Sequence, residues 1–132
     1  MSTELTFLTL TAAFTAVLWM PIIANRLYEM GAWTALKNPQ PDVRPKADWA
    51  YRLSNAHRNA VENLAVFAPL ALAVHVLGVG DPLTGLWATI FFASRVAHAT
   101  IYTAGIPLLR TIAFFTGFLA QMVFAGRLLG LL

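Results

Sequence analysis

The chain has 132 residues, of which 58% are hydrophobic and 11% are charged, and its formal net charge is +3. Since a soluble domain carries about a quarter charged residues, this composition excludes a soluble enzyme, a disordered tail and a coiled coil. The chain contains no cysteine, which excludes disulfides, thiolate metal sites and a cysteine nucleophile.

Several apolar segments approach the length needed to cross a membrane, which is about 20 residues. The first is expected as a helix over residues 5–27. Because no positive residue precedes it and its apolar run is long, we expect it to be retained and not cleaved as a signal peptide. Three prolines among charged and polar residues then predict a cytoplasmic loop over residues 28–48.

Three further helices are expected after this loop, over residues 49–77, 83–103 and 108–131. Turns that contain glycine and proline separate them, at residues 78–82 and 104–107. Long helices joined by short turns lie antiparallel to their neighbours. The sequence therefore predicts an all-α fold, an integral-membrane up-down four-helix bundle that forms a single domain over residues 1–132.

The basic residues predict the orientation of this bundle. The first loop and its edge carry Arg26, Lys37, Arg44 and Lys46, whereas the amino terminus and the 78–82 turn carry no Lys or Arg. Because loops rich in Lys and Arg stay in the cytoplasm, we expect a multi-pass membrane protein with both termini on the non-cytoplasmic side. In so apolar a chain, these charges indicate a membrane surface and lipid partners, not nucleic acid.

Polar and ionisable side chains within the predicted helices need an explanation, because each is costly in a membrane. Helical spacing places most of them on one face of each helix. They are Arg52, Asn55, Asn59, Glu62 and Asn63 on the second helix, Arg95, His98 and Tyr102 on the third, and Arg110 at the start of the fourth. The two turns bring them to one depth, within a layer roughly 15 Å thick near the cytoplasmic end. Three helices are therefore predicted to contribute to one polar site.

Structural roles compete with a binding role for these residues. Arg52 and Arg58 would also serve as interfacial residues whose guanidinium groups reach lipid phosphates. Arg95 lies too deep for that role, so we expect it to pair with Glu62 or to line a cavity. A structural Arg95–Glu62 pair is compatible with a ligand site beside it.

A cationic, amide-rich cluster with one carboxylate complements a ligand that has two carboxylates, one ammonium and peptide bonds, as glutathione does. An arginine beside the sulfur of such a ligand would favour the thiolate, which is the nucleophile. A proton-coupled exporter fits less well, because it needs a carboxylate deep in a helix and the first helix has none after Glu4. His75 and His98 are predicted towards opposite ends of the bundle, which argues against a shared haem iron, and no metal site is expected.

Two segments carry a resemblance to a known family. Residues 55–63 (Asn-Ala-His-Arg-Asn-Ala-Val-Glu-Asn), followed by Phe67, resemble the helix-two signature of the MAPEG family, the membrane-associated proteins in eicosanoid and glutathione metabolism. Residues 95–102, with the Gly-Ile-Pro turn at 105–107 and Arg110-Thr111, resemble its helix-three and helix-four signature. The similarity covers essentially the whole chain and is nearest to the bacterial branch, so the resemblance implies a bacterial inner membrane protein.

The resemblance implies a homotrimer that holds glutathione, as co-substrate, between neighbouring subunits near the cytosolic face. It assigns Asn59 and Glu62 to the glutathione backbone and amino group, and Arg110 to the thiolate. The expected glutathione site is Arg52, Asn55, Asn59, Glu62, Asn63, Arg95, His98, Tyr102 and Arg110, with Arg110 and Tyr102 as the catalytic residues. Asn55 departs from the family pattern, which often has arginine there, and this change should weaken a carboxylate contact.

The leading hypothesis is a membrane-embedded, glutathione-dependent transferase or peroxidase-like enzyme with an arginine-stabilised thiolate. Its second substrate would be a lipophilic electrophile that arrives from the bilayer. The alternative is a non-catalytic membrane binder of a lipid or other amphiphilic anion on the same scaffold, which the asparagine at position 55 favours.

Overall fold

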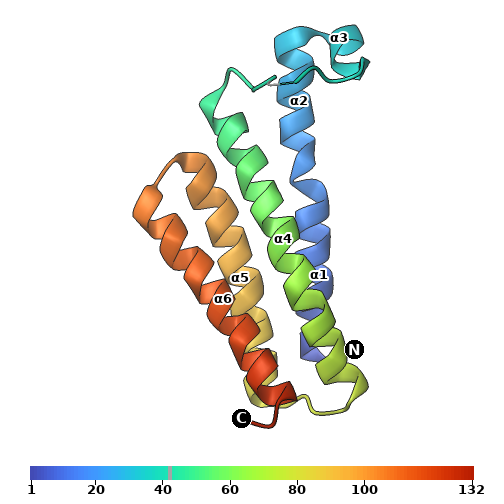
Figure 1. Cartoon of the computed structure of the whole chain (residues 1–132), viewed down its shortest axis with the longest axis vertical. Helices are drawn as coiled ribbons and strands as arrows, with labels where there is room; N and C mark the ends of the chain where they lie inside the picture. The colour runs from blue at the N-terminus through green and yellow to red at the C-terminus, as the bar shows by residue number, and fades with distance from the viewer. Residues whose placement is uncertain (42) are drawn as a thin grey trace.

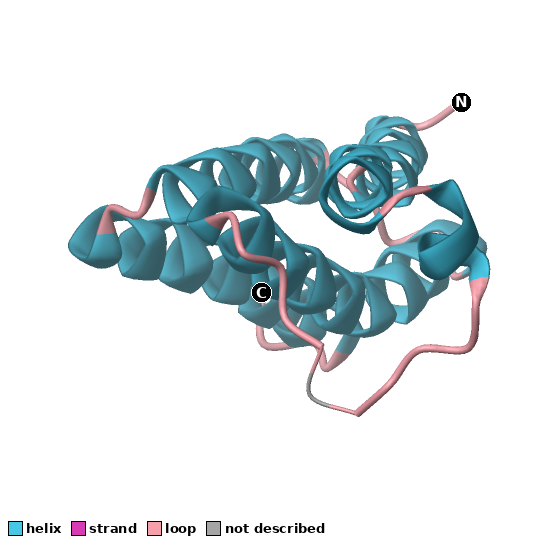
Figure 2. Ribbon diagram, turned by 90° about the horizontal axis from the view of Figure 1, so that it is seen from above, coloured by secondary structure: helices cyan, strands magenta, loops and turns pink. Residues whose placement is uncertain are grey.

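The computed structural model describes residues 1–41 and 43–132. Its helices are α1 (Thr3–Val17), α2 (Trp19–Met30), α3 (Ala32–Leu36), α4 (Asp48–Val76), α5 (Pro82–Ala104) and α6 (Pro107–Leu128). The described residues form helices, turns and loops and contain no strand, as Figure 2 shows. The predicted all-α class is therefore confirmed.

Helices α1 and α2 form one long segment with a break at Leu18. Pro21 lacks the backbone N–H that would bond the carbonyl of Val17, and its ring crowds that carbonyl. The helix tightens here, where the backbone N–H of Leu18 donates to the carbonyl of Thr15 at 3.4 Å. The segment expected as one helix over residues 5–27 therefore contains two helical pieces that meet near a proline.

The region expected as a loop over residues 28–48 includes α3, a helix of five residues. Glu29, near the end of α2, accepts hydrogen bonds from the backbone N–H groups of Lys46 at 3.0 Å and Ala47 at 2.9 Å. These two bonds tie the chain just before α4 to the end of α2. The start of α4 is thereby held beside α2.

Turn residues explain the tight connections on either side of α5. Asp81 and Thr84 form a reciprocal capping box at its start, with Pro82 as its first residue. Gly105 ends α5 with a φ of 81°, a conformation that glycine adopts at little cost. Pro107 then begins α6, so α5 and α6 form a close hairpin.

Helix α5 packs against α1, α4 and α6. Figure 1 shows both chain termini at one end of the molecule and α2 and α3 at the other. A buried aromatic core joins three helices: the ring of Phe67 on α4 stacks on Phe91 of α5 at 3.8 Å and meets Phe124 of α6 edge-on at 5.1 Å. This core fixes the relative heights of α4, α5 and α6 one turn away from Arg95.

Three described segments are long and apolar enough to cross a membrane: Thr3–Met30, Asp48–Val76 and Pro107–Leu128. Helix α5 has 23 residues but is not among them. Arg95 and His98 lower its hydropathy, and both side chains are buried against neighbouring helices. Conversely, α6 exposes Leu109, Ile112 and Phe115, as expected for a surface that contacts lipid or another copy of the chain.

Candidate functional site

Arg95 is the most deeply buried charged residue of the described chain, with 1% of its surface exposed. Its Nη1 donates to Oδ1 of Asn59 at 3.2 Å, and its Nη2 donates to the carbonyls of Ala113 at 3.1 Å and Phe114 at 3.3 Å. Its Nε lies 3.4 Å from Oγ of Ser94. One guanidinium group therefore joins α4, α5 and α6.

The expected pairing of Arg95 with Glu62 is wrong. The ion pairs among the described residues are Arg44–Asp48 and Arg127–Asp81. Glu62 is exposed, whereas Asn59, one turn earlier on α4, faces α5 and meets the guanidinium. Amide and main-chain oxygens thus take the place of the carboxylate, and their partial charges stabilise the cation.

The close approach of α6 to this arginine depends on Gly117. A Cβ atom there would lie 2.5 Å from Nη2 of Arg95 and 2.9 Å from Oγ of Ser94. The space that a side chain would fill is therefore occupied by the guanidinium. Sequence reasoning missed this glycine, and its only signal was a small residue opposite an arginine in the paired helix.

Three side chains continue this polar face toward the hairpin between α5 and α6. The ring of His98, which is 5% exposed, lies 5.5 Å from the ring of Tyr102 and 6.2 Å from that of Phe114. The guanidinium carbon of Arg110 lies 4.4 Å above the ring of Tyr102, a cation–π arrangement. The structure therefore places Arg110 and Tyr102 together, at the common depth that the turn length predicts.

Arg52 lies beside this group but is engaged by the backbone. Its Nε donates to the carbonyl of Thr103 at 2.9 Å, in the last turn of α5 where carbonyls lack helical partners. A Cβ at Gly105 would lie 3.2 Å from its guanidinium carbon. Arg52 therefore caps the end of α5, a stabilising position for a cation.

Asn63 lies one turn further into the protein than Asn59 and is 8% exposed. Its Nδ2 donates to the carbonyl of Asn59 at 2.9 Å. Nε2 of Gln121 on α6 donates to its carbonyl and to its Oδ1, both at 3.2 Å. Asn63 therefore links α4 to α6, with its amide donating within α4 and accepting from α6.

Asn55 lies at the edge of this face, toward α2. Its Nδ2 donates to the carbonyl of Tyr51 at 3.2 Å, and it lines a cavity between α2 and α4. The predicted site thus divides. Asn59, Arg95, His98, Tyr102 and Arg110 are brought together, with Arg52 at their border. Asn63 contacts Asn59 but turns toward Gln121, Asn55 lines the cavity between α2 and α4, and Glu62 is exposed.

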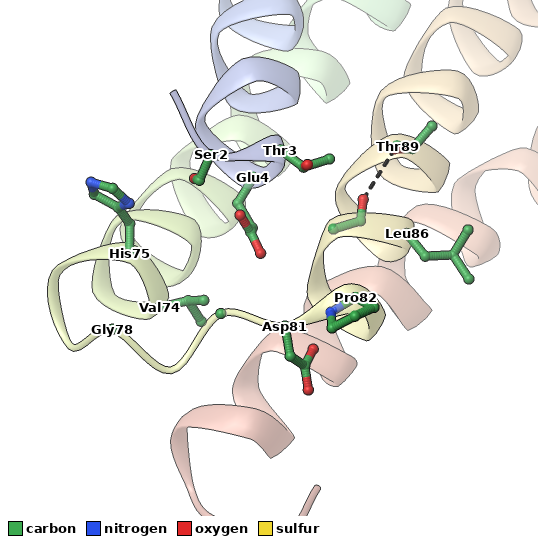
Figure 3. A pocket seen from close by; sticks show the side chains of 12 residues that line it. Ser2, Thr3, Glu4, Val74, His75, Gly78, Asp81, Pro82, Leu86 and Thr89 are labelled. Atoms are coloured by element: carbon green, nitrogen blue, oxygen red, sulfur yellow. Dashed lines mark hydrogen bonds between the residues drawn. The ribbon is translucent and has the colours of Figure 1, made fainter.

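A cavity of about 800 Å³ at the opposite end of the molecule contains none of the predicted site residues. Figure 3 shows Glu4 and His75 beside it, with the carboxylate of Asp81 directed away from Glu4. Oε1 of Glu4 accepts a hydrogen bond from Oγ1 of Thr84 at 2.6 Å. In the described ranges, no three His, Asp or Glu side chains gather to hold a metal ion.

Asp81 lies in the turn before α5 and is paired with Arg127 of α6 at 3.2 Å. The backbone N–H of Thr84, and secondarily the charge of Arg127, hold the pKa of the Asp81 carboxyl below its usual value. This ion pair fastens the turn to the end of α6, far from the polar face of α5.

The sequence of the chain is similar to that of a known family. The sequence model of the MAPEG family matches residues 5–130, nearly the whole chain. No curated protein matches the chain.

Proposed function

The chain belongs to the MAPEG family, and on that premise we propose that it is a membrane-embedded, glutathione-dependent transferase or peroxidase-like enzyme that acts on a lipophilic electrophile. The observation that carries this proposal is the position of Arg110 over Tyr102, beside His98 on the face of α5 whose Arg95 contacts Asn59 of α4. The family places the chain among membrane proteins of glutathione-related metabolism.

Arg110 and Tyr102 have the chemistry to stabilise a thiolate. Neither ion pair of the described residues involves Arg110, so its charge is available to an anion. A guanidinium beside a thiol lowers the pKa of the thiol, and a phenol O–H adds a hydrogen-bond donor. We propose that Arg110 holds the glutathione sulfur as thiolate and that Tyr102 donates to it.

Asn59 and Glu62 suit the remaining groups of the tripeptide. Because Oδ1 of Asn59 accepts from Arg95, its NH2 group is free to donate to a carboxylate or a peptide carbonyl. Glu62, one turn further along α4, is exposed and offers a carboxylate to the ammonium group. The amide of Asn59 thus suits a negatively charged or carbonyl group of the ligand, and the carboxylate of Glu62 suits its positively charged ammonium group.

We propose that a neighbouring subunit completes the site. Asn55 and Glu62 lie along one edge of α4, and this helix exposes the apolar side chains of Val61 and Val66. A partner helix against that edge would cover this apolar surface. Glu62 would then face a ligand that is held between the two subunits. A homotrimer of four-helix up-down bundles, with α5 as the fourth crossing, supplies such a partner.

We propose that the α2–α3 end faces the cytoplasm and that both termini lie outside a bacterial inner membrane. Lys37, Arg44 and Lys46 lie at that end, and loops rich in basic residues stay in the cytoplasm. The glutathione site would then open to the cytoplasm, where the tripeptide is present as a soluble anion.

Isothermal titration of purified protein with glutathione tests this proposal. The protein should bind saturably, and Arg110→Ala and Glu62→Ala should each weaken binding about tenfold or more, the size of a lost charge-assisted hydrogen bond. Arg127→Ala is the matched control, because Arg127 pairs with Asp81 at the other end of the molecule. Absence of saturable binding, or binding indifferent to both changes, would contradict the proposal.

A further inference from the structure

Helix α3 exposes two large apolar side chains at the α2–α3 end of the molecule. Trp33 is 74% exposed and Leu36 is 77% exposed. Because residues three apart lie on one side of a helix, these two side chains share a face of α3. Among the described helices, α3 packs against α2 alone. The described part of the chain therefore leaves this apolar face uncovered.

Helix α3 is too short to be stable through its own backbone hydrogen bonds. It has five residues, and no side chain caps its start. Isolated helices shorter than about 12 residues are marginal in water, and most helices gain their stability by burying an apolar face. A contact that removes Trp33 and Leu36 from water would therefore stabilise α3.

The depth of α3 relative to a bilayer follows from the segment that precedes it. Thr3–Met30 is long and apolar enough to cross a membrane and has 28 residues. At a rise of about 1.5 Å per residue, this segment is roughly 42 Å long. A bilayer is roughly 40–45 Å thick when its headgroup layers are included. A span that begins at one surface therefore ends in the headgroup layer of the other surface, where α3 begins.

Gly31 turns the chain out of the direction of α2 at this depth. Its φ of 78° is in a region that glycine adopts at little cost, and Figure 1 shows α3 turned away from the axis of α2. Nζ of Lys37 lies 5.9 Å from the centre of the Trp33 ring. A tryptophan with a lysine beside it is typical of helices that lie in the membrane interface.

We propose that α3 is an interfacial anchor that lies on the lipid bilayer. Trp33 and Leu36 insert between the lipid headgroups, and the ammonium group of Lys37 reaches the phosphates. The lipid surface, and not another protein, covers this face, because the exposed side chains of Leu27 and Tyr28 in the last turn of α2 lead directly to it.

The anchor bears on the connection between α2 and α4. Glu29 accepts hydrogen bonds from the backbone N–H groups of Lys46 and Ala47, which fixes the far end of this connection to α2. Contact of α3 with lipid would fix its near end. The segment that the sequence predicts as a cytoplasmic loop is then held at both ends, to the bilayer and to the protein.

Spin labelling in lipid nanodiscs tests the proposal in the full chain. The chain has no cysteine, so Leu36→Cys and Thr34→Cys each provide a single site for a nitroxide label. Thr34 is the matched control, because it is exposed but lies on another face of α3. In nanodiscs of phosphatidylethanolamine and phosphatidylglycerol, the label collides with oxygen in the apolar layer and with a nickel chelate in water. We expect the ratio of oxygen to nickel collisions to be about threefold or more higher at position 36 than at position 34.

A charge on the anchoring face should remove this difference. With the label at position 36, Trp33→Asp should lower the ratio to that measured at position 34, whereas Thr34→Asp should leave it unchanged. Both residues are exposed, so we expect both variants to fold. Trp33→Ser provides the same comparison if Trp33→Asp does not fold.

Three results would overturn the proposal. The first is an equal ratio at positions 34 and 36, and the second is a high ratio at position 36 that persists in the Trp33 variants. The third is protection of position 36 from both oxygen and nickel, because that result would assign the face to another protein or to a second copy of the chain.

This inference requires that the segment Thr3–Met30 crosses a membrane, and it does not depend on glutathione binding. Arg110→Ala should leave the collision ratios unchanged, since Arg110 is on α6 and not on α3. A protein that shows the expected ratios but does not bind glutathione would keep the anchor and lose the proposed enzymatic function. A protein that binds glutathione but shows equal ratios would keep that function and lose the anchor.

Discussion

Nη1 of Arg95 donates to Oδ1 of Asn59 across the contact between α5 and α4 at 3.2 Å. Because a guanidinium has donors and no acceptor, the amide of Asn59 must turn its oxygen toward Arg95. Its NH2 group is thereby directed away from the arginine. Arg95 is therefore a positioning residue for the proposed site, since it leaves the NH2 group of Asn59, and not its oxygen, to face a ligand.

Replacement of Arg95 separates this positioning role from its contribution to stability. Arg95→Lys keeps a buried charge with fewer partners and should lower the free energy of unfolding by on the order of 2 kcal/mol. Arg95→Met removes the charge and should cost less, because buried ions carry a desolvation penalty. Both variants should weaken glutathione binding, as measured by titration alongside thermal unfolding. Binding that follows stability alone would show that Arg95 does not position Asn59.

Gly117→Ala tests the close approach of α6 to Arg95. The added Cβ would meet Nη2 of Arg95 at 2.5 Å, and overpacking of this kind costs typically ~1–3 kcal/mol. Gly126→Ala is the control on the same helix, because its Cβ would meet only the terminal side chain of Leu132. Alanine is intrinsically the better helix former, so Gly126→Ala should keep or raise the unfolding temperature while Gly117→Ala lowers it. Equal effects of the two changes would contradict this account of Gly117.

The turn lengths predict the heights of these residues along their helices, whereas helical spacing does not predict which side chain of α4 faces Arg95. The turn at residues 78–82 puts Glu62 and Arg95 at nearly one height, and the stacking of Phe67 on Phe91 agrees with that register. Helical rotation nevertheless turns Glu62 to the surface and Asn59 toward α5. A difference of one helical turn lies within the reach of an arginine side chain, so spacing alone does not select its partner.

The spacing of Arg95, His98 and Tyr102 correctly predicts that these residues share one face of α5, and the length of the 104–107 turn predicts Arg110 beside Tyr102. The contacts that involve the backbone were not predictable in this way. The carbonyls that receive Arg52 and Arg95 belong to ordinary helical residues, and no side chain marks them in the sequence.

Variants of Tyr102 and Arg110 should separate the contributions of the phenol O–H and of the guanidinium charge to the pKa of the bound glutathione thiol. Tyr102→Phe retains the ring beneath Arg110 but loses the O–H donor, so the pKa of bound glutathione should rise modestly. Arg110→Ala removes the cation as well as its contact with the ring, and the thiol pKa should rise by about one unit or more, since nearby charges shift pKa values by such amounts. Arg110→Lys should lie between wild type and Arg110→Ala. Thiolate absorbance measured as a function of pH distinguishes the variants, and identical titration curves would exclude a role for both residues.

We expect the ionised carboxylate of Asp81, at the end of the molecule remote from the proposed site, to make the thermal stability of the protein sensitive to acid. Because the pKa of Asp81 in the folded protein is held below its ordinary value of 3.8, by the backbone N–H of Thr84 and then by Arg127, its carboxylate stabilises the fold at pH values above that figure. This contribution is lost as the pH falls through the lower folded pKa, when the carboxyl takes up a proton and the pair with Arg127 is broken. Wild-type protein should therefore lose thermal stability more steeply than Asp81→Asn as the pH falls toward and below 3.8. Arg127→Gln should reduce the slope only in part, since the Thr84 hydrogen bond remains. Parallel curves for wild type and Asp81→Asn would show that the ionised Asp81 does not stabilise the contact between the start of α5 and the end of α6.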